Sequence, residues 1–256
     1  DGVRELQPAA AVAHALQLVA DGADILDIGG VSTRPNADPV PEAEELRRVL
    51  PVVEALAPQV TVPLSIDTRK PTVARAALAE GASLVNDVEA RRTDEELWRI
   101  VADAQAGYVC MHMQGTPATM QQNPCYVDVV REVGDFFNDR LARLSRCGIA
   151  PDRVALDVGI GFGKDLDHNL DLLAGLESYK RFGRPLLLGV SRKSFLGRLL
   201  GASVDARLPG AIACTTWAAN AGVQVFRTHD VAATCQALRM TETLRVRAAK
   251  AACPGH

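Results

Sequence analysis

The sequence predicts an α/β fold, a (β/α)8 barrel whose first strand is missing from the given chain. Short apolar runs alternate with helical stretches along the whole sequence. Several segments repeat one order of features, a helix ending at a glycine and then an apolar strand, as in "ADGADILDIGG", "AEGASLVNDV" and "NAGVQVFRTHD". The apolar runs are nearly continuous, as parallel strands covered on both faces require. We expect one domain, residues 1–256.

The expected elements follow in chain order. Strands are predicted at 24–28, 62–66, 83–86, 108–111, 153–156, 186–190 and 223–226. Helices are predicted at 8–19, 41–57, 71–80, 93–104, 126–147, 168–180 and 205–221. Prolines suited to a first helical turn stand at Pro8, Pro41 and Pro71.

Seven strands are readable, whereas a closed βα barrel needs eight. The chain opens on a helix with no strand before it, so we expect an upstream segment to supply the first strand. A seven-stranded open sheet is the competing architecture. Its usual Gly-rich dinucleotide loop after the first strand is absent, and "GIGFGK" (159–164) comes late in the chain.

The net charge and the composition limit the classes of partner that the chain can bind. The chain has 28 Lys and Arg against 31 Asp and Glu, a net charge of −3, which provides no general basic field for nucleic acid or an anionic membrane. We therefore expect neither as a partner, and any anionic ligand must be held locally. The uncharged span 208–226 is interrupted by proline and glycine and is interpreted as a buried helix plus strand.

The six cysteines include no C-x-x-C pair and mostly have apolar neighbours. This pattern predicts reduced core thiols in a reducing compartment, the cytoplasm. Cys110 and His112 face one side of a predicted strand, but two ligands without partners favour core packing over zinc.

Every predicted strand ends in polar residues, where a βα barrel carries its reactive groups. These residues are Asp27, Asp67, Asn86, Asp87, His112, Asp157, Lys193, Arg227 and His229. Each one alone is better explained as a helix cap or a solvated side chain. The whole set is harder to explain in that way, because an unpaired charge buried at a barrel mouth costs several kcal/mol unless a partner or ligand meets it.

Seven ordered motifs carry a family resemblance: "DIGGxSTRP", "SIDTxKPxVA", "NDV", "MHMQGTPxTMQxNPxY", "GIGFGK", "GVSRKSFLG" and "RxHDV". Together they resemble the dihydropteroate synthase family from residue 1 to about residue 244. The resemblance implies a Mg²⁺-assisted transferase of folate biosynthesis and a sulfonamide target. Its reaction would join (7,8-dihydropterin-6-yl)methyl diphosphate to para-aminobenzoate, giving 7,8-dihydropteroate and diphosphate.

The resemblance assigns the pterin pocket to Thr33, Asp67, Asn86, Asp157 and Lys193. A pterin offers two adjacent N–H donors that a carboxylate such as Asp157 can accept together, while its ring acceptors need donors such as Lys193. The diphosphate would be held by Arg227 and His229, which share one face if their strand continues. The expected catalytic residues are Asp67, Lys193, Arg227 and His229.

The aminobenzoate is expected to lie under a lid. By the resemblance this lid is Thr33, Arg34 and Pro35, with Phe162 and Ser191 shaping the same pocket. Arg192 points away from its neighbours and is predicted to pair with an acidic residue.

The sequence departs from the family pattern in three places. Family members usually begin with a strand and an "N-x-T-P-D-S-F" loop whose Asn helps bind Mg²⁺, whereas this chain starts at Asp1-Gly2. No metal ligand is therefore expected within the sequence itself, and the Asn would lie upstream. Val31 replaces a usual Glu and Val158 a usual Pro.

Two alternatives remain open at this point. One is a methyltetrahydrofolate-dependent methyltransferase barrel, which has little use for a diphosphate grip at "SRK" and "R-x-H". The other is a non-catalytic pterin-binding remnant. Family precedent and the apolar helices near 193–221 also lead us to expect a homodimer.

Overall fold

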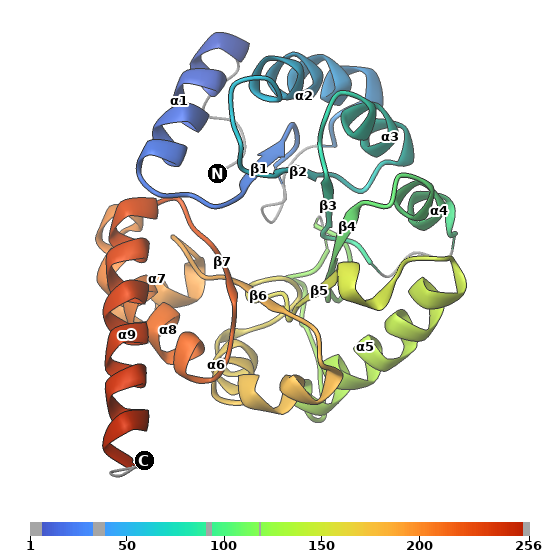
Figure 1. Ribbon diagram of the computed structural model, residues 1–256. Coiled ribbons are helices and arrows are strands. Elements are labelled where there is room, and N and C mark those ends of the chain that lie inside the picture. Colours follow the sequence, from blue (N-terminus) through green and yellow to red (C-terminus); the bar gives the residue numbers. More distant parts are fainter. Residues whose placement is uncertain (1–6, 33–38, 91–93, 118, 253–256) are drawn as a thin grey trace.

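The chain folds as a curled sheet of seven parallel strands with helices around its outside (Figure 1). The computed structural model describes residues 7–32, 39–90, 94–117 and 119–252. The strands pair in sequence order, so each neighbour in the sheet is also the next strand along the chain.

The strands are β1 (Leu26–Gly29), β2 (Leu64–Asp67), β3 (Leu84–Asp87), β4 (Gly107–Met111), β5 (Val154–Asp157), β6 (Leu186–Gly189) and β7 (Val225–Arg227). The helices are α1 (Pro8–Ala20), α2 (Glu42–Leu56), α3 (Pro71–Ala79), α4 (Glu96–Asp103), α5 (Val129–Arg146), α6 (Leu166–Ala174), α7 (Ser194–Leu200), α8 (Leu208–Asn220) and α9 (Val231–Ala252). Short 3₁₀ segments lie at Pro151–Arg153, Leu176–Phe182 and Val204–Ala206.

All seven predicted strands are confirmed, and the helical predictions differ mainly in their ends. The helix predicted at 168–180 is wrong as one unit, because α6 ends at Ala174 and a 3₁₀ segment follows Gly175. Glycine is a poor helix former, and a Cβ at this position would lie 2.8 Å from a methyl carbon of Val130 in α5. The predicted ranges also omitted α7 and α9.

Within the described residues, β1 and β7 are the two edges of the sheet and do not pair with each other. Their surrounding helices nevertheless meet, since the Cys235 thiol of α9 donates to the Gly22 carbonyl after α1, at 3.4 Å. The described fold is therefore a curled seven-stranded sheet with the layout of a barrel. The additional strand expected before residue 1 stays a prediction.

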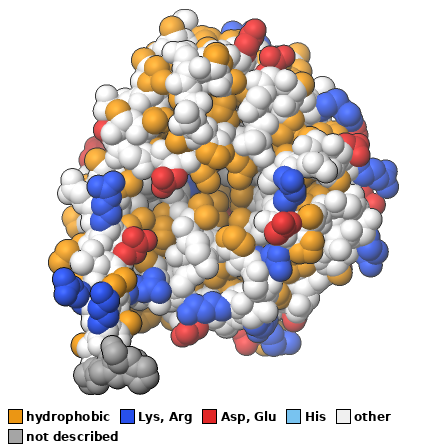
Figure 2. All heavy atoms as spheres, viewed as in Figure 1, with side chains coloured by type: hydrophobic (Ala, Val, Ile, Leu, Met, Phe, Trp, Pro, Cys, Tyr) orange, Lys and Arg blue, Asp and Glu red, His pale blue; other side chains and the backbone are white. Residues whose placement is uncertain are grey.

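The apolar interior lies between the sheet and its helices, and in β2 and β6 every residue is buried. In the space-filling view along the same direction, hydrophobic side chains occupy the centre and charged ones lie mostly toward the rim (Figure 2). Cys110 is buried as predicted, but Cys125 is exposed, so the expectation of core thiols fails there. Among the described residues, no helix has the length and apolar character needed to span a membrane.

A buried series of hydrogen bonds connects α4, β4 and β3. Trp98 Nε1 donates to the Tyr108 hydroxyl at 2.8 Å, and that hydroxyl donates to Asp87 Oδ2 at 2.7 Å. Burial raises the pKa of Tyr108 well above its usual value, and the charge of Asp87 adds to this effect. Asp87 of the "NDV" motif is therefore occupied by a structural partner.

Replacing Tyr108 with Phe should lower the free energy of unfolding by about 2–4 kcal/mol, because it leaves one buried donor and one buried acceptor unpaired. Chemical denaturation would measure the loss. A change below about 1 kcal/mol would show that water or a rearranged side chain replaces the hydroxyl.

Candidate active site

Three buried polar side chains stand at the carboxyl ends of strands β2, β3 and β5. Asp67, Asn86 and Asp157 end or approach the ends of β2, β3 and β5 and are 8%, 5% and 7% exposed. The parallel register places Asp67 directly beside Asn86. Apolar strand bodies carry these groups to one end of the sheet, as the sequence predicted.

Asp27 of β1 connects this group to the far edge of the sheet. Its Oδ2 atom accepts from Asn86 Nδ2 at 3.0 Å and from Arg227 Nε at 2.6 Å. Arg227 also donates through Nη2 to Asp67 Oδ2, at 3.1 Å. One guanidinium thus joins β7 to β1 and β2 across the open edge of the sheet.

The electrostatics of this network are strongly shifted. Burial raises the pKa of Asp67 to about 7, and the nearby charge of Asp27 adds to the shift while Arg227 opposes it. The Asp27 charge in turn raises the pKa of Arg227 further above its usual range. Among the described residues, Asp27 Oδ1 is buried and has no hydrogen-bond partner. An anion approaching Arg227 would therefore meet a permanent cation beside two carboxyl groups.

Asp157 and Lys193 form the other half of the site. Asp157 Oδ1 accepts from the Gly159 amide at 2.7 Å, and burial raises the Asp157 pKa although Lys193 opposes the shift. Lys193 donates through Nζ to the Ile160 carbonyl, and Nζ lies 4.8 Å from the centre of the Phe162 ring. Burial lowers the pKa of Lys193 to about 8, with the Asp157 charge acting against the shift.

Ser191 and His229 lie close together, and the condition under which His229 would share a strand face with Arg227 is not met. The strand β7 ends at Arg227, so His229 lies in the following loop and does not share a strand face with Arg227. Its Nδ1 atom is 2.9 Å from Ser191 Oγ. The expected partner of Arg192 is confirmed as Asp230, with Nη2 to Oδ1 at 2.9 Å.

Apolar side chains form a wall next to the polar groups. Met111, Met113 and Met120 cluster with Val88, and Phe162 packs against them. A cavity of about 140 Å³ opens nearby, with Asp67, Lys70 and Met113 among its lining residues. A flat ring with polar edges fits such a combination of apolar faces and buried donors and acceptors.

The predicted lid residues Thr33, Arg34 and Pro35 lie outside the described residues. Within the described part, the structure adds three residues to which sequence reasoning gave no role: Asp27, Met113 and Lys164. Asp27 was visible as a polar strand end. Its contact with Arg227 spans 200 positions, and no local pattern indicates such a pair.

A family model described as "Pterin binding enzyme" matches residues 1–229. A dihydropteroate synthase of Escherichia coli (strain K12) is 47% identical over 234 residues, which cover 91% of this chain and 82% of the relative. The family model therefore spans every strand and every polar strand end described above.

Solved structures agree with this match. A Yersinia pestis dihydropteroate synthase in a sulfonamide drug complex superposes with a TM-score of 0.93 at 41% identity, covering 96% of this chain and 89% of that one. A Xanthomonas albilineans dihydropteroate synthase in complex with 7,8-dihydropteroate gives 0.85 at 42% identity, covering 96% and 88%.

Proposed function

The chain belongs to the dihydropteroate synthase family of pterin-binding enzymes, and from this premise we propose which of its residues carry out the reaction. It is a transferase of folate synthesis that condenses a dihydropterin methyl diphosphate with para-aminobenzoate. The observation that carries the residue assignment is the convergence of Asp67, Asn86, Asp157, Lys193 and Arg227 at one end of the sheet.

Asp157, Asn86 and Lys193 bind the pterin ring in this proposal. Asp157 uses Oδ1 for the Gly159 amide and retains acceptor capacity for two adjacent pterin N–H groups. Asn86 gives one of its two amide N–H bonds to Asp27, which leaves its carbonyl oxygen and its other N–H to be offered to the ring. Lys193 donates to the ring acceptors. Thr33, which is outside the described residues, is assigned to the same pocket by the family resemblance.

Arg227 and His229 stabilise the leaving diphosphate. The Nε and Nη2 atoms of Arg227 are held by Asp27 and Asp67, so the Nη1 edge of the guanidinium is the edge presented to an anion. Ionised Asp67 would favour the positive charge that develops on the pterin methylene carbon as diphosphate departs. The aryl amine is already a usable nucleophile, so no activating base is required.

Mg²⁺ is part of the same proposal. The sequence predicted no metal ligand within the chain, but Asp27 Oδ1 is a buried carboxylate oxygen without a hydrogen-bond partner among the described residues. Such an oxygen can ligate a divalent cation, so this residue fits the ion. Mg²⁺ characteristically takes its other ligands from water and phosphate oxygens. When bound it would neutralise charge on the departing diphosphate.

The aminobenzoate is assigned to the space between Phe162, Ser191 and the predicted lid of Thr33, Arg34 and Pro35. Phe162 supplies an apolar face, and Lys193 lies close to its ring. Ser191 is held by His229 next to the proposed diphosphate position.

Diphosphate release tests the function directly. Release that requires both the pterin diphosphate and para-aminobenzoate, and that depends on Mg²⁺, is the expected result. Pterin binding without release would instead indicate a binding protein, and methyl transfer to a corrinoid would indicate the methyltransferase alternative.

We further propose a cytoplasmic homodimer. The five described cysteines are free thiols, which suits a reducing compartment. Exposed large apolar side chains gather on α7, α8, α9 and the segment after α7. They are Leu199, Leu200, Val204, Trp217, Met240, Leu244 and Val246. An apolar surface of this kind on neighbouring helices fits the face of a second copy.

Replacing Leu244 with Glu should weaken the dimer by about tenfold or more, because it places an unpaired charge in an apolar interface. Light scattering after size exclusion would report a parent mass of twice 27.3 kDa and a variant that shifts toward 27.3 kDa. Val127→Glu is the matched control, since Val127 is 92% exposed away from these helices. Equal masses for all three proteins would contradict the proposed interface.

A further inference from the structure

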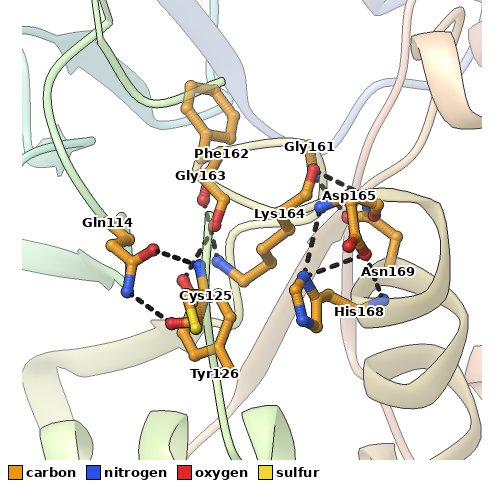
Figure 3. A network of polar contacts seen from close by, with 10 residues as sticks. All are labelled: Gln114, Cys125, Tyr126, Gly161, Phe162, Gly163, Lys164, Asp165, His168 and Asn169. Carbon is orange, nitrogen blue, oxygen red and sulfur yellow. Dashed lines mark hydrogen bonds and ion pairs between the residues drawn. The ribbon is translucent and has the colours of Figure 1, made fainter. Parts of the chain in front are cut away.

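Side chains bind five successive carbonyl oxygens in the loop that follows β5. Figure 3 shows part of this arrangement, with Tyr126 and Lys164 pointing at the loop backbone. The donors to the carbonyls of residues 160–164 are, in that order, Lys193, Gln121, Lys164, Tyr126 and Asn169. The conformation of the loop is therefore set by side chains from several elements as well as by its own sequence.

Lys164 is the most buried member of this set, with 1% of its surface exposed. Its Nζ atom lies 3.0 Å from the Phe162 carbonyl, 3.0 Å from His112 Nδ1 and 3.4 Å from the His112 carbonyl. An ammonium group has three N–H bonds, and these three acceptors use all of them. The match requires an unprotonated Nδ1, so the neutral His112 ring carries its proton on Nε2.

The two loops joined by Lys164 touch along their backbones. Gly159 and Gly163 have φ angles of +69° and +63°. A Cβ at Gly159 would stand 1.9 Å from the His112 carbonyl oxygen, and one at Gly163 would stand 2.3 Å from the Gln114 carbonyl oxygen. The glycines of "GIGFGK" thus permit a close approach that the Lys164 ammonium then holds in place.

The same loop contacts both halves of the proposed pterin site. Its Gly159 amide binds Asp157, and its Ile160 carbonyl receives the Lys193 ammonium. Phe162, whose carbonyl Lys164 holds, packs against the methionine wall. A shift of this backbone by a fraction of an ångström would displace an acceptor, a donor and an apolar contact together.

We propose that Lys164 and His112 form a latch that positions Asp157 and Lys193 for pterin binding. Lys164 is a positioning residue here, because it contacts the loop and not the proposed ligand. Burial lowers the pKa of Lys164 to about 7, and the Asp157 charge partly restores it, so the role rests on the three contacts of Nζ. The inference rests on the proposed pterin pocket.

Lys164→Met tests the latch, because methionine fills a similar volume and removes all three donors. We expect a fall of about 10- to 100-fold in kcat/KM for the pterin diphosphate, carried by both weaker pterin binding and slower turnover. Titration calorimetry would measure pterin binding on protein whose folding is verified by circular dichroism. The matched control is Lys180→Met, whose lysine makes an exposed ion pair with Glu177 and should behave as the parent.

A second pair of variants tests the same hydrogen bond from the His112 side. His112→Asn keeps an acceptor near the Nδ1 position, whereas His112→Gln moves the amide beyond it, and both lose the edge contact with the Phe136 ring. Asn should therefore preserve pterin affinity and Gln should lose it, even if both lower stability equally. This pair decides the question if Lys164→Met does not fold.

Parent-like pterin affinity and kcat in folded Lys164→Met, or equal affinities for the two His112 variants, would overturn the latch. Diphosphate release by the unmodified protein is measured first. Its absence would refute the proposed function and not the latch, so the two failures are distinguishable.

Discussion

Replacing Asp157 with Asn should raise the Kd for the pterin diphosphate by at least about 100-fold, because each buried N–H donor of the pterin left unpaired costs about 1–3 kcal/mol. The Asn carbonyl can still accept from the Gly159 amide, which keeps the loop in place. Its amide N–H groups would then face the N–H donors of the pterin. Donor facing donor is the physical reason for the large loss, and titration calorimetry would measure it.

Asp87→Asn is the matched control, because Asp87 is also a buried aspartate at the end of a strand of the same sheet, β3. Its carboxylate accepts from Tyr108, so this variant should lose stability and retain pterin affinity per folded molecule. Losses of affinity that are equal in both variants would mean that general damage to the sheet, and not a missing ligand contact, weakens binding.

The Asp157 substitution should also change the titration of Lys193. The Asp157 charge supports the ammonium form of Lys193, while burial lowers its pKa to about 8. Without that carboxylate the pKa should fall below about 8, so less of the donor is protonated at neutral pH. The pH dependence of the remaining turnover should accordingly lose activity at a lower pH than the parent does.

The sheet was predictable because its signal is local. Each strand is a short apolar run, and several of these runs follow a glycine that ends a helix, as before β1, β3 and β7. In β2 and β6 every residue is buried, as those runs implied. The helix break at Gly175 was missed although glycine is a poor helix former, and the close approach of this position to Val130 of a different helix has no signal in the sequence. The ends of helices thus reflect tertiary contacts that the hydrophobic pattern does not contain.

In the candidate site, too, the local sequence predicts some features and tertiary contacts decide others. The positions of Asp67, Asn86, Asp157 and Arg227 at strand ends predicted that they belong to the site, because parallel strands bring such ends together. Arg227 and His229 were expected to share a face only if their strand continued, and it does not, because β7 ends at Arg227 and His229 lies beside Ser191. The burial of Lys164 had no sequence signal, because a lysine in a glycine loop is ordinarily solvated.

Arg227→Met should lower kcat/KM by about 100- to 1,000-fold, the usual loss when a preorganised donor to a developing anion is removed. It should also leave two carboxyl groups, Asp27 and Asp67, without their shared cation. In the parent the folded pKa of Asp67, about 7, lies above its ordinary value of 3.8, so the folded state binds more protons between these values. The unfolding free energy therefore falls as pH rises across that window.

Removing Arg227 takes away a charge that lowers the Asp67 pKa, so the fall should continue above pH 7. Denaturation at pH 5 and pH 8 should show a larger gap between parent and Arg227→Met at pH 8. Adding Asp27→Asn to Arg227→Met removes one of the two facing charges and should recover much of this stability. Turnover should not return, because the donor to diphosphate is still missing. Recovered turnover in the double variant would show that Arg227 acts only by balancing Asp27, and would exclude the proposed contact with diphosphate.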